Sequence, residues 1–137
     1  MHLEWRAPFD DRALSELHAA AFGGPVGDRP WFAQVSRHSL GWVCASDDTG
    51  RLAGFVNVAW DGGAHAFVLD AIVHPRRQRD GIGRQMVALA IERARAAGCE
   101  WLHVDFDARL EPFYLDACRF SPTSAGLIDL GAGGRPG

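Results

Sequence analysis

The stretch that decides the fold reads Leu69-Asp70-Ala71-Ile72-Val73-His74-Pro75-Arg76-Arg77-Gln78-Arg79-Asp80-Gly81-Ile82-Gly83-Arg84. An apolar strand ends at Pro75, and a basic loop leads into an amphipathic helix that we expect from about Gly81 to Ala97. The first N–H groups of such a helix have no internal partner, and the helix dipole favours an anion beside them. Gly81 and Gly83 leave the backbone open to a phosphate because they lack a Cβ. The stretch therefore predicts a phosphate cradle.

Two other interpretations of this stretch stay open at this point. A Rossmann fingerprint would need a third glycine where Met86 stands, and no first-strand context supports it. The other interpretation is an ordinary glycine-containing helix start with a solvated face of arginines.

The rest of the chain predicts a single α/β domain, of mixed α+β character, in which helices cover a mostly antiparallel sheet. The run from His65 to Val73 is apolar on both faces, so we expect a central strand covered on both sides. The other expected strands are Leu3–Arg6, Leu40–Ala45, Leu52–Trp60, Trp101–Phe106 and Thr123–Leu130, and the other expected helices are Asp10 or Asp11 to Phe22, Trp31–Arg37 and Leu110–Ala117. Residues 1–130 form the predicted domain, and the glycine-rich residues 131–137 are predicted to be a disordered tail.

Composition excludes several classes of protein. All 14 basic residues are Arg, so lysine-dependent chemistry such as a P-loop or a Schiff base is ruled out. The net charge of −3 argues against nucleic acid as the main partner, and no apolar run is long enough to span a membrane. The three cysteines contain no C-x-x-C pair and fit a cytoplasmic protein, and the histidine spacing gives no metal site.

The segment Gln78-Arg79-Asp80-Gly81-Ile82-Gly83 resembles the Q/R-x-x-G-x-G/A signature of the GNAT superfamily, whose members are acyl-CoA-dependent N-acyltransferases. The preceding Ile72–Pro75 resembles the end of that family's fourth strand, and Glu111–Phe120 resembles its F-Y-x-x-x-G-F segment. In the family that segment carries Gly where this chain has Arg119. We therefore expect strain or altered geometry at Arg119, because a residue after a helix end often needs positive φ.

The resemblance implies a fold in which the fourth and fifth strands splay apart to admit the pantetheine arm of acetyl-CoA. It implies that the backbone of Ile72 and Val73 binds the pantetheine and that the backbone amides of Arg79 to Arg84 bind the pyrophosphate. Asp107 lies where the family often has an Asn that contacts the cofactor. The cofactor-binding residues implied are Ile72, Val73, Gln78, Arg79, Asp80, Gly81, Ile82, Gly83, Arg84 and Asp107.

Two residues are candidates for catalysis. The resemblance gives Tyr114, the single Tyr of the chain, the role of protonating the departing thiolate; packing of the short helix is the alternative. Asp70 is the one carboxylate in an apolar strand, so it is a candidate general base, with a structural hydrogen bond as the alternative. Phe22, Trp31 and Trp60 are candidates to line the acceptor pocket, although aromatic residues also fill cores.

The sequence analysis therefore predicts transfer of an acetyl group from acetyl-CoA, as co-substrate, to a small-molecule or peptide amine, without a metal ion. The alternatives are a non-catalytic CoA-binding module and an interaction or nucleic-acid module that uses the arginines of residues 76–84. A homodimer is the assembly to expect first, since C2 dimers are the commonest soluble oligomers.

Overall fold

The computed structural model describes residues 1–131, so residues 132–137 of the predicted tail lie outside the described part. The strands are β1 (His2–Trp5), β2 (Ser39–Ser46), β3 (Leu52–Trp60), β4 (His65–Val73) and β5 (Trp101–His103). The α-helices are α1 (Asp11–Phe22), α2 (Trp31–His38) and α3 (Ile82–Ala96), and the short helices are η1 (Pro75–Arg77), η2 (Ala108–Leu110) and η3 (Pro112–Ala117).

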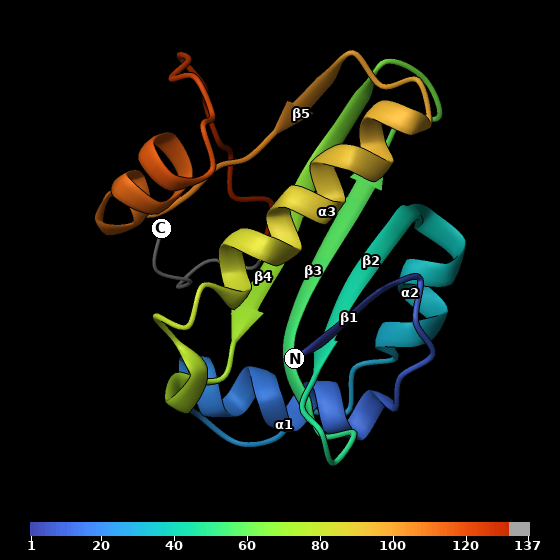
Figure 1. Ribbon diagram of the computed structural model, residues 1–137. Helices are drawn as coiled ribbons and strands as arrows, with labels where there is room; N and C mark the ends of the chain where they lie inside the picture. Colours follow the sequence, from blue (N-terminus) through green and yellow to red (C-terminus); the bar gives the residue numbers. More distant parts are fainter. Residues whose placement is uncertain (132–137) are drawn as a thin grey trace.

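The five strands form one sheet in the order β1-β2-β3-β4-β5. The first three pairings are antiparallel, and β4 pairs with β5 in parallel through the crossover helix α3 (Figure 1). This arrangement confirms the predicted mixed, mostly antiparallel sheet in a single α/β domain.

Short-range hydrogen bonds fix the boundaries of several elements. The Asp10 carboxylate accepts from the Ala13 N–H at 3.1 Å and caps α1. Asp47 accepts from the N–H groups of Thr49 and Arg51 in the β2–β3 turn, and Asp61 accepts from those of Gly63 and His65 in the β3–β4 turn. These turns confirm the predicted antiparallel meander.

The two faces of the sheet are covered to different extents. On one face α3 lays an apolar side onto β2, β3 and β4, and on the other face α1 and α2 cover only the part around Phe55 and Ile72. The buried residues of the α3 face include Val43, Val56, Val58, Val68, Met86 and Ala90, and those of the α1 and α2 face include Leu14, Leu17, Trp31, Val35, Trp42 and Phe55.

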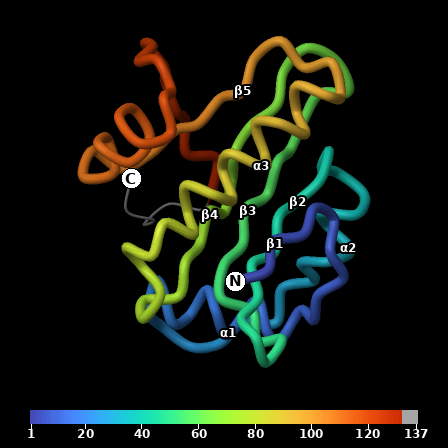
Figure 2. Tube along the Cα trace, viewed as in Figure 1, coloured from blue at the N-terminus to red at the C-terminus, as the bar shows by residue number. Residues whose placement is uncertain are grey.

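Strands β4 and β5 pair along a short length and then separate. Only His65, Ala66 and Phe67 pair with β5, whereas β4 continues to Val73. The tube in Figure 2 shows the chain leaving β4 after β5 and continuing toward the short helices. The predicted splay of the fourth and fifth strands is thus confirmed. From Val68 to Val73, β4 has no strand partner on the side of β5, and we call this side the gap between β4 and β5.

Three expectations about the strands were wrong. Residues 123–130 form no strand, and Leu127, Ile128 and Leu130 are highly exposed because no neighbouring strand edge receives them. Strand β5 ends at His103 rather than Phe106. Strand β4 is covered on both faces only near its end, where Ile72 packs under α1 and α2, whereas Phe67 and Leu69 lie beyond that cover and are exposed.

None of the helices described has the length and apolar character needed to cross a membrane.

Candidate active site

The start of α3 has the geometry of an anion site. Gly81 precedes the helix with a left-handed φ of 80°, and no side chain caps it. The first backbone bond into the helix runs from Gln85 N–H to Gly81 C=O at 3.1 Å, so the N–H groups of Ile82, Gly83 and Arg84 have no partner inside the helix. Three parallel donors at the positive end of a 15-residue helix have the geometry and polarity that favour an anion.

Local contacts fold the loop that leads to this helix start. The His74 ring nitrogen Nδ1 accepts from the Arg76 N–H at 3.1 Å, and Gln78 Nε2 donates to the Val73 carbonyl at 3.2 Å. Arg79 has a left-handed φ of 76°, which an L-residue adopts at a cost. Gln78, Arg79 and Asp80 are exposed, so the side chains of the signature lie at the rim and its backbone forms the cradle.

Strand alternation separates the roles of Ile72 and Val73. His74 N–H donates to the Ala53 carbonyl of β3 at 2.8 Å, and successive residues of a strand direct their backbone groups to opposite sides. Val73 therefore directs its backbone groups into the gap, whereas Ile72, which pairs with Phe55, directs its groups toward β3. The side chain of Ile72 packs in the core beneath α1 and α2.

Gly83 joins three elements at the cradle. A Cβ on Gly83 would lie 3.2 Å from Phe113 Cζ of η3 and 3.5 Å from Val73 Cγ2 of β4. Gly83 thus allows the start of α3, the end of β4 and η3 to meet. This contact also brings Tyr114, the neighbour of Phe113, close to the cradle.

Tyr114 is buried with its hydroxyl group accessible. Its ring contacts Phe106, Phe113 and Phe120 at centroid distances of 5.0, 4.8 and 5.9 Å. No buried side-chain oxygen or nitrogen of the described residues lacks a partner, and the hydroxyl has no protein partner there, so it reaches solvent. Burial raises the pKa of Tyr114 above its ordinary value, with smaller contributions from Cys118 and Asp105. The phenol therefore keeps its proton and can donate it.

The short helix that carries Tyr114 ends in the geometry expected at Arg119. The Phe120 N–H donates back to the Tyr114 carbonyl at 2.9 Å, and Arg119 between them has a φ of 69°. A glycine would adopt this conformation without steric cost. The strain predicted at this position is present.

Asp70 lies in a bulge of β4. Phe55 pairs with Ile72 but Asn57 pairs with Leu69, so β4 has one residue more than β3 over this interval, and Asp70 has a φ of 52°. The bulge turns Asp70 to the same face as Leu69, where Asn57 Nδ2 donates to Asp70 Oδ2 at 3.4 Å.

Asn57 was missed by the sequence analysis. It is 2% exposed and accepts from the Ser39 hydroxyl at 2.5 Å while its amide nitrogen faces Asp70. A carboxylate only accepts hydrogen bonds, so this arrangement fixes the orientation of the amide. The signal available in the sequence was a single amide inside the apolar run LAGFVNVAW of β3.

Two of the three candidate acceptor residues, Phe22 and Trp31, contact the same His18 ring at centroid distances of 4.9 and 5.8 Å, and Trp60 lies apart from them. Phe22 is exposed at the end of α1 beside His18. Trp31 is buried between α1 and the sheet, where its indole N–H donates to Ser15 at 3.1 Å. Trp60 packs on the α3 face, opposite to Asn57. Of the three, only Phe22 faces solvent on the side of α1 and α2.

Asp107 and the cysteines have structural environments. Asp107 accepts from the Arg109 N–H at 3.1 Å and caps η2, so its carboxylate is already engaged. Burial raises the pKa of the Cys44 thiol to about 12, which makes it a small core residue rather than a nucleophile. Across residues 1–131 no three His, Cys, Asp or Glu side chains gather in a way that could hold a metal ion.

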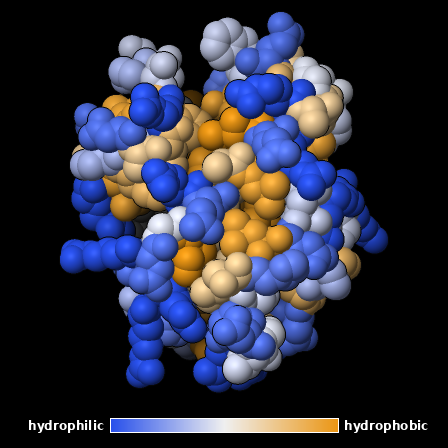
Figure 3. All heavy atoms as spheres, in the orientation of Figure 1, coloured by the Kyte–Doolittle hydropathy of each residue, from blue (hydrophilic) through white to orange (hydrophobic). Residues whose placement is uncertain are grey.

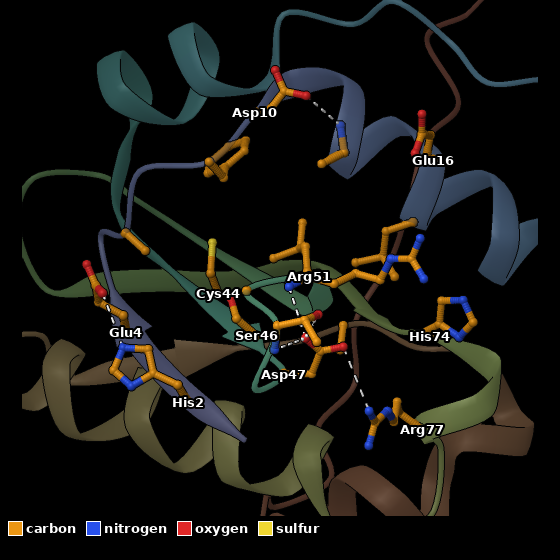
Figure 4. A pocket seen from close by; sticks show the side chains of 18 of the residues that line it. His2, Glu4, Asp10, Glu16, Cys44, Ser46, Asp47, Arg51, His74 and Arg77 are labelled. Atoms are coloured by element: carbon orange, nitrogen blue, oxygen red, sulfur yellow. Dashed lines mark hydrogen bonds and ion pairs between the residues drawn. The ribbon is translucent and has the colours of Figure 1, made fainter.

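A cleft with a volume of about 1140 Å³ lies elsewhere, between α1 and the strands β1 to β3 (Figure 4). It reaches the loop before α3 through His74, Arg76 and Arg77, and the Arg77 guanidinium lies 3.8 Å from the Asp47 carboxylate. Asp70 and Tyr114 do not line it.

On the α3 face, apolar side chains gather around α3 and are surrounded by charged residues (Figure 3). A smaller groove there is lined by α3, Cys118 and Arg119.

A family model described as acetyltransferase (GNAT) family matches residues 4–118, and the chain belongs to this family. A GNAT family acetyltransferase from Streptococcus pneumoniae is 22% identical, with a TM-score of 0.72 over 95% of this chain and 98% of that one. Glucosamine-6-phosphate N-acetyltransferase from Arabidopsis thaliana is 16% identical, with a TM-score of 0.73 over 94% and 98%. AAC(6')-Iy, in complex with the bisubstrate analogue CoA-S-monomethyl-acetylneamine, is 17% identical, with a TM-score of 0.72 over 96% and 99%. At these identities the likeness shows the fold.

Proposed function

We propose that this protein is a cytoplasmic N-acetyltransferase that moves an acetyl group from acetyl-CoA to a primary amine of a small molecule or peptide. The observation that carries the proposal is the uncapped start of α3, with Gly83 against Val73 and Phe113, directly beside the gap between β4 and β5. A CoA complex of a protein with the same fold supports it.

The cradle holds the cofactor through its backbone. The N–H groups of Ile82, Gly83 and Arg84 bind the pyrophosphate, and the N–H group of Val73, whose carbonyl accepts from Gln78, binds the pantetheine arm. The exposed side chains of Arg79 and Arg84 add positive charge at the rim. Gln78 and Asp80 shape the loop, and Asp107 keeps its capping role.

Acyl transfer to an amine needs a neutral nucleophile. An alkylamine with a pKa of about 10.4 is neutral about once in 2,500 molecules at pH 7, which corresponds to about 4.6 kcal/mol. Asp70 takes the ammonium proton, directly or through a water molecule, and Asn57 holds its carboxylate in place.

The reaction then proceeds by direct attack. The amine nitrogen forms a bond to the acetyl carbonyl carbon and releases its second proton to solvent, the C–S bond breaks, and the sulfur of CoA leaves as a thiolate. Tyr114 donates its phenolic proton to this thiolate, and the phenolate regains a proton from solvent through its accessible hydroxyl. The products are the N-acetyl amine, CoA and the proton released by the ammonium.

The variant Tyr114→Phe tests this assignment, because it keeps the ring and removes the proton donor. We expect kcat to fall by about 100-fold, with the Kd for acetyl-CoA unchanged, as measured by thiol release and calorimetry. Undiminished turnover would remove Tyr114 from the mechanism. Binding of acetyl-CoA without thiol release with any amine would identify a non-catalytic CoA-binding module instead.

A further inference from the structure

An exposed aromatic strip lies on the sheet beyond α1 and α2. We define the aromatic strip as His65, Phe67 and Leu69 of β4 with Trp101 and His103 of β5. Phe67 is 40% exposed, Leu69 41% and Trp101 66%. The rings are ordered against each other, since His103 stacks on Phe67 with a centroid distance of 4.7 Å and an interplanar angle of 16°.

The apolar residues of the aromatic strip are not needed to bury β4 in the core. Ala66 and Val68, the residues between those of the strip, are already buried against α3 on the other face. A strand with one face in solvent normally alternates apolar with polar residues, but β4 presents Phe67 and Leu69 to water. Large apolar side chains grouped at a surface indicate a binding site.

The position of the aromatic strip relates it to the proposed reaction. Leu69 precedes Asp70, and the bulge of β4 turns both side chains to the same face. The strip therefore begins at the proposed base and runs along β4 to the edge of the sheet at Trp101.

The charges around the aromatic strip select one kind of ligand. Strands β3, β4 and β5 contain no Arg or Lys, and Asp70 is their one carboxylate. His65 Nδ1 and His103 Nε2 lie 2.8 Å apart, and one of two hydrogen-bonded imidazole nitrogens must be a neutral acceptor. A cationic group is complementary to Asp70, whereas an anionic group has no strand-borne partner here.

We propose that the acceptor is a primary amine on an aromatic or branched apolar body without an anionic group, which lies along the aromatic strip with its nitrogen at Asp70. This proposal rests on the proposed function and names its substrate class. The amine is acetylated as described above, so the strip itself contributes only apolar and stacking contacts.

Matched amines test the substrate class. Acetyl-CoA thiol release is measured with tryptamine, with ethanolamine, which lacks an apolar body, and with glucosamine 6-phosphate, which is anionic. We expect kcat/KM for tryptamine to exceed that for ethanolamine by at least about tenfold, because the indole buries apolar surface, and glucosamine 6-phosphate to be the poorest acceptor. Equal or better turnover of glucosamine 6-phosphate would overturn the proposal.

The variant Phe67→Ser locates the effect. It should lower kcat/KM for tryptamine at least fivefold and that for ethanolamine less than twofold, with the Kd for CoA unchanged. Leu127→Ser is the matched control, because Leu127 is an exposed apolar residue outside the strip, at 85% exposure. Equal losses with both amines, or no loss with tryptamine, would show that the strip does not bind the acceptor.

A binding measurement separates this proposal from the proposed function. The ¹⁹F NMR line of 5-fluorotryptamine should broaden with the CoA-loaded protein and with Leu127→Ser, but not with Phe67→Ser. Phe67-dependent binding without any acetyl transfer would refute the enzyme and leave the strip in place. Acetyl transfer that does not depend on Phe67 would support the enzyme and refute the strip as the acceptor site. Sedimentation that shows a dimer dissociated by Phe67→Ser would identify a self-association surface and overturn the proposal.

Discussion

The two faces of the sheet present their functional groups in different ways. On the face covered by α3, apolar packing continues up to the first turn of the helix. The groups without an intrahelical partner there are backbone N–H groups, and Gly81 and Gly83 set the conformation of this turn. On the other face the cover by α1 and α2 ends beyond Phe55 and Ile72, and the groups left free are side chains. The proposed cofactor site should therefore tolerate loss of side chains but not an added Cβ, and the proposed acceptor site should show the opposite.

The largest expected effect is that of Gly83→Trp on the cofactor site. A Cβ alone would already lie 3.2 Å from Phe113 Cζ and 3.5 Å from Val73 Cγ2, so the indole must displace these neighbours. We expect CoA affinity to fall at least about 100-fold, or about 2.7 kcal/mol. Gly27→Trp is the control, because a Cβ there meets nothing within 4 Å.

Calorimetry with both variants, and thermal melting to confirm that both are folded, provides the readout. Arg79→Ala belongs to the same comparison. It removes an exposed charge and should weaken CoA binding only a few-fold. If Arg79→Ala lowered CoA affinity more than a folded Gly83→Trp variant did, side chains rather than the backbone would form the cradle.

The Asn57→Leu variant tests the side-chain face. Without the amide, nothing in β3 orients the Asp70 carboxylate, and we expect kcat to fall roughly tenfold, as for loss of one hydrogen bond to a charged group. The Kd for CoA should not change. Ser39→Ala, one bond further from Asp70, should have a smaller effect on kcat in the same assay. If Asn57→Leu changed only the affinity for CoA and not kcat, Asn57 would not act on Asp70.

The pH dependence of turnover should report Tyr114. Burial raises the pKa of this phenol, so the donor stays protonated through its ordinary value of 10.0 and activity should decline only at higher pH. The folded state holds this proton more tightly than the unfolded state, so the contribution of Tyr114 to stability is complete below pH 10 and lost as pH rises further. If activity already declines at a pH well under 10, and Tyr114→Phe shows the same decline, the titrating group is not Tyr114.

The smallest expected effect concerns Arg119, whose left-handed φ lies next to the α3 face. Arg119→Gly relieves the steric cost of this conformation and should stabilise the protein by about 1 kcal/mol. That corresponds to a rise in Tm of about 3 °C, measurable by thermal melting. A lower Tm would indicate that contacts of the Arg119 side chain outweigh the backbone strain.

Much of the fold could be predicted from the sequence because its signals are local. The Asp47 and Asp61 turns, the Asp10 cap and the periodicity of α3 each depend on a few neighbouring residues. The segment 123–130 has the composition of a strand, but a strand also needs a partner edge, and the departure of the chain after β5 depends on the whole fold.

The candidate site was predicted less completely, because composition does not tell an apolar core residue from an apolar ligand-binding one. Trp31 and Trp60 proved to pack in the structure, whereas Phe67 and Leu69, which read as core, are exposed. Asn57 reaches Asp70 only because the β4 bulge shifts the pairing of β3 with β4. The residue pattern of neither strand predicts that bulge.

The most direct test of the account is a calorimetric titration of the wild-type protein with coenzyme A, with thermal melting in parallel. The account predicts saturable heat, a stoichiometry of one CoA per chain and a rise in Tm, all abolished by Gly83→Trp. Absence of both heat and a Tm shift at millimolar CoA would contradict the assignment of the α3 start as the cofactor site.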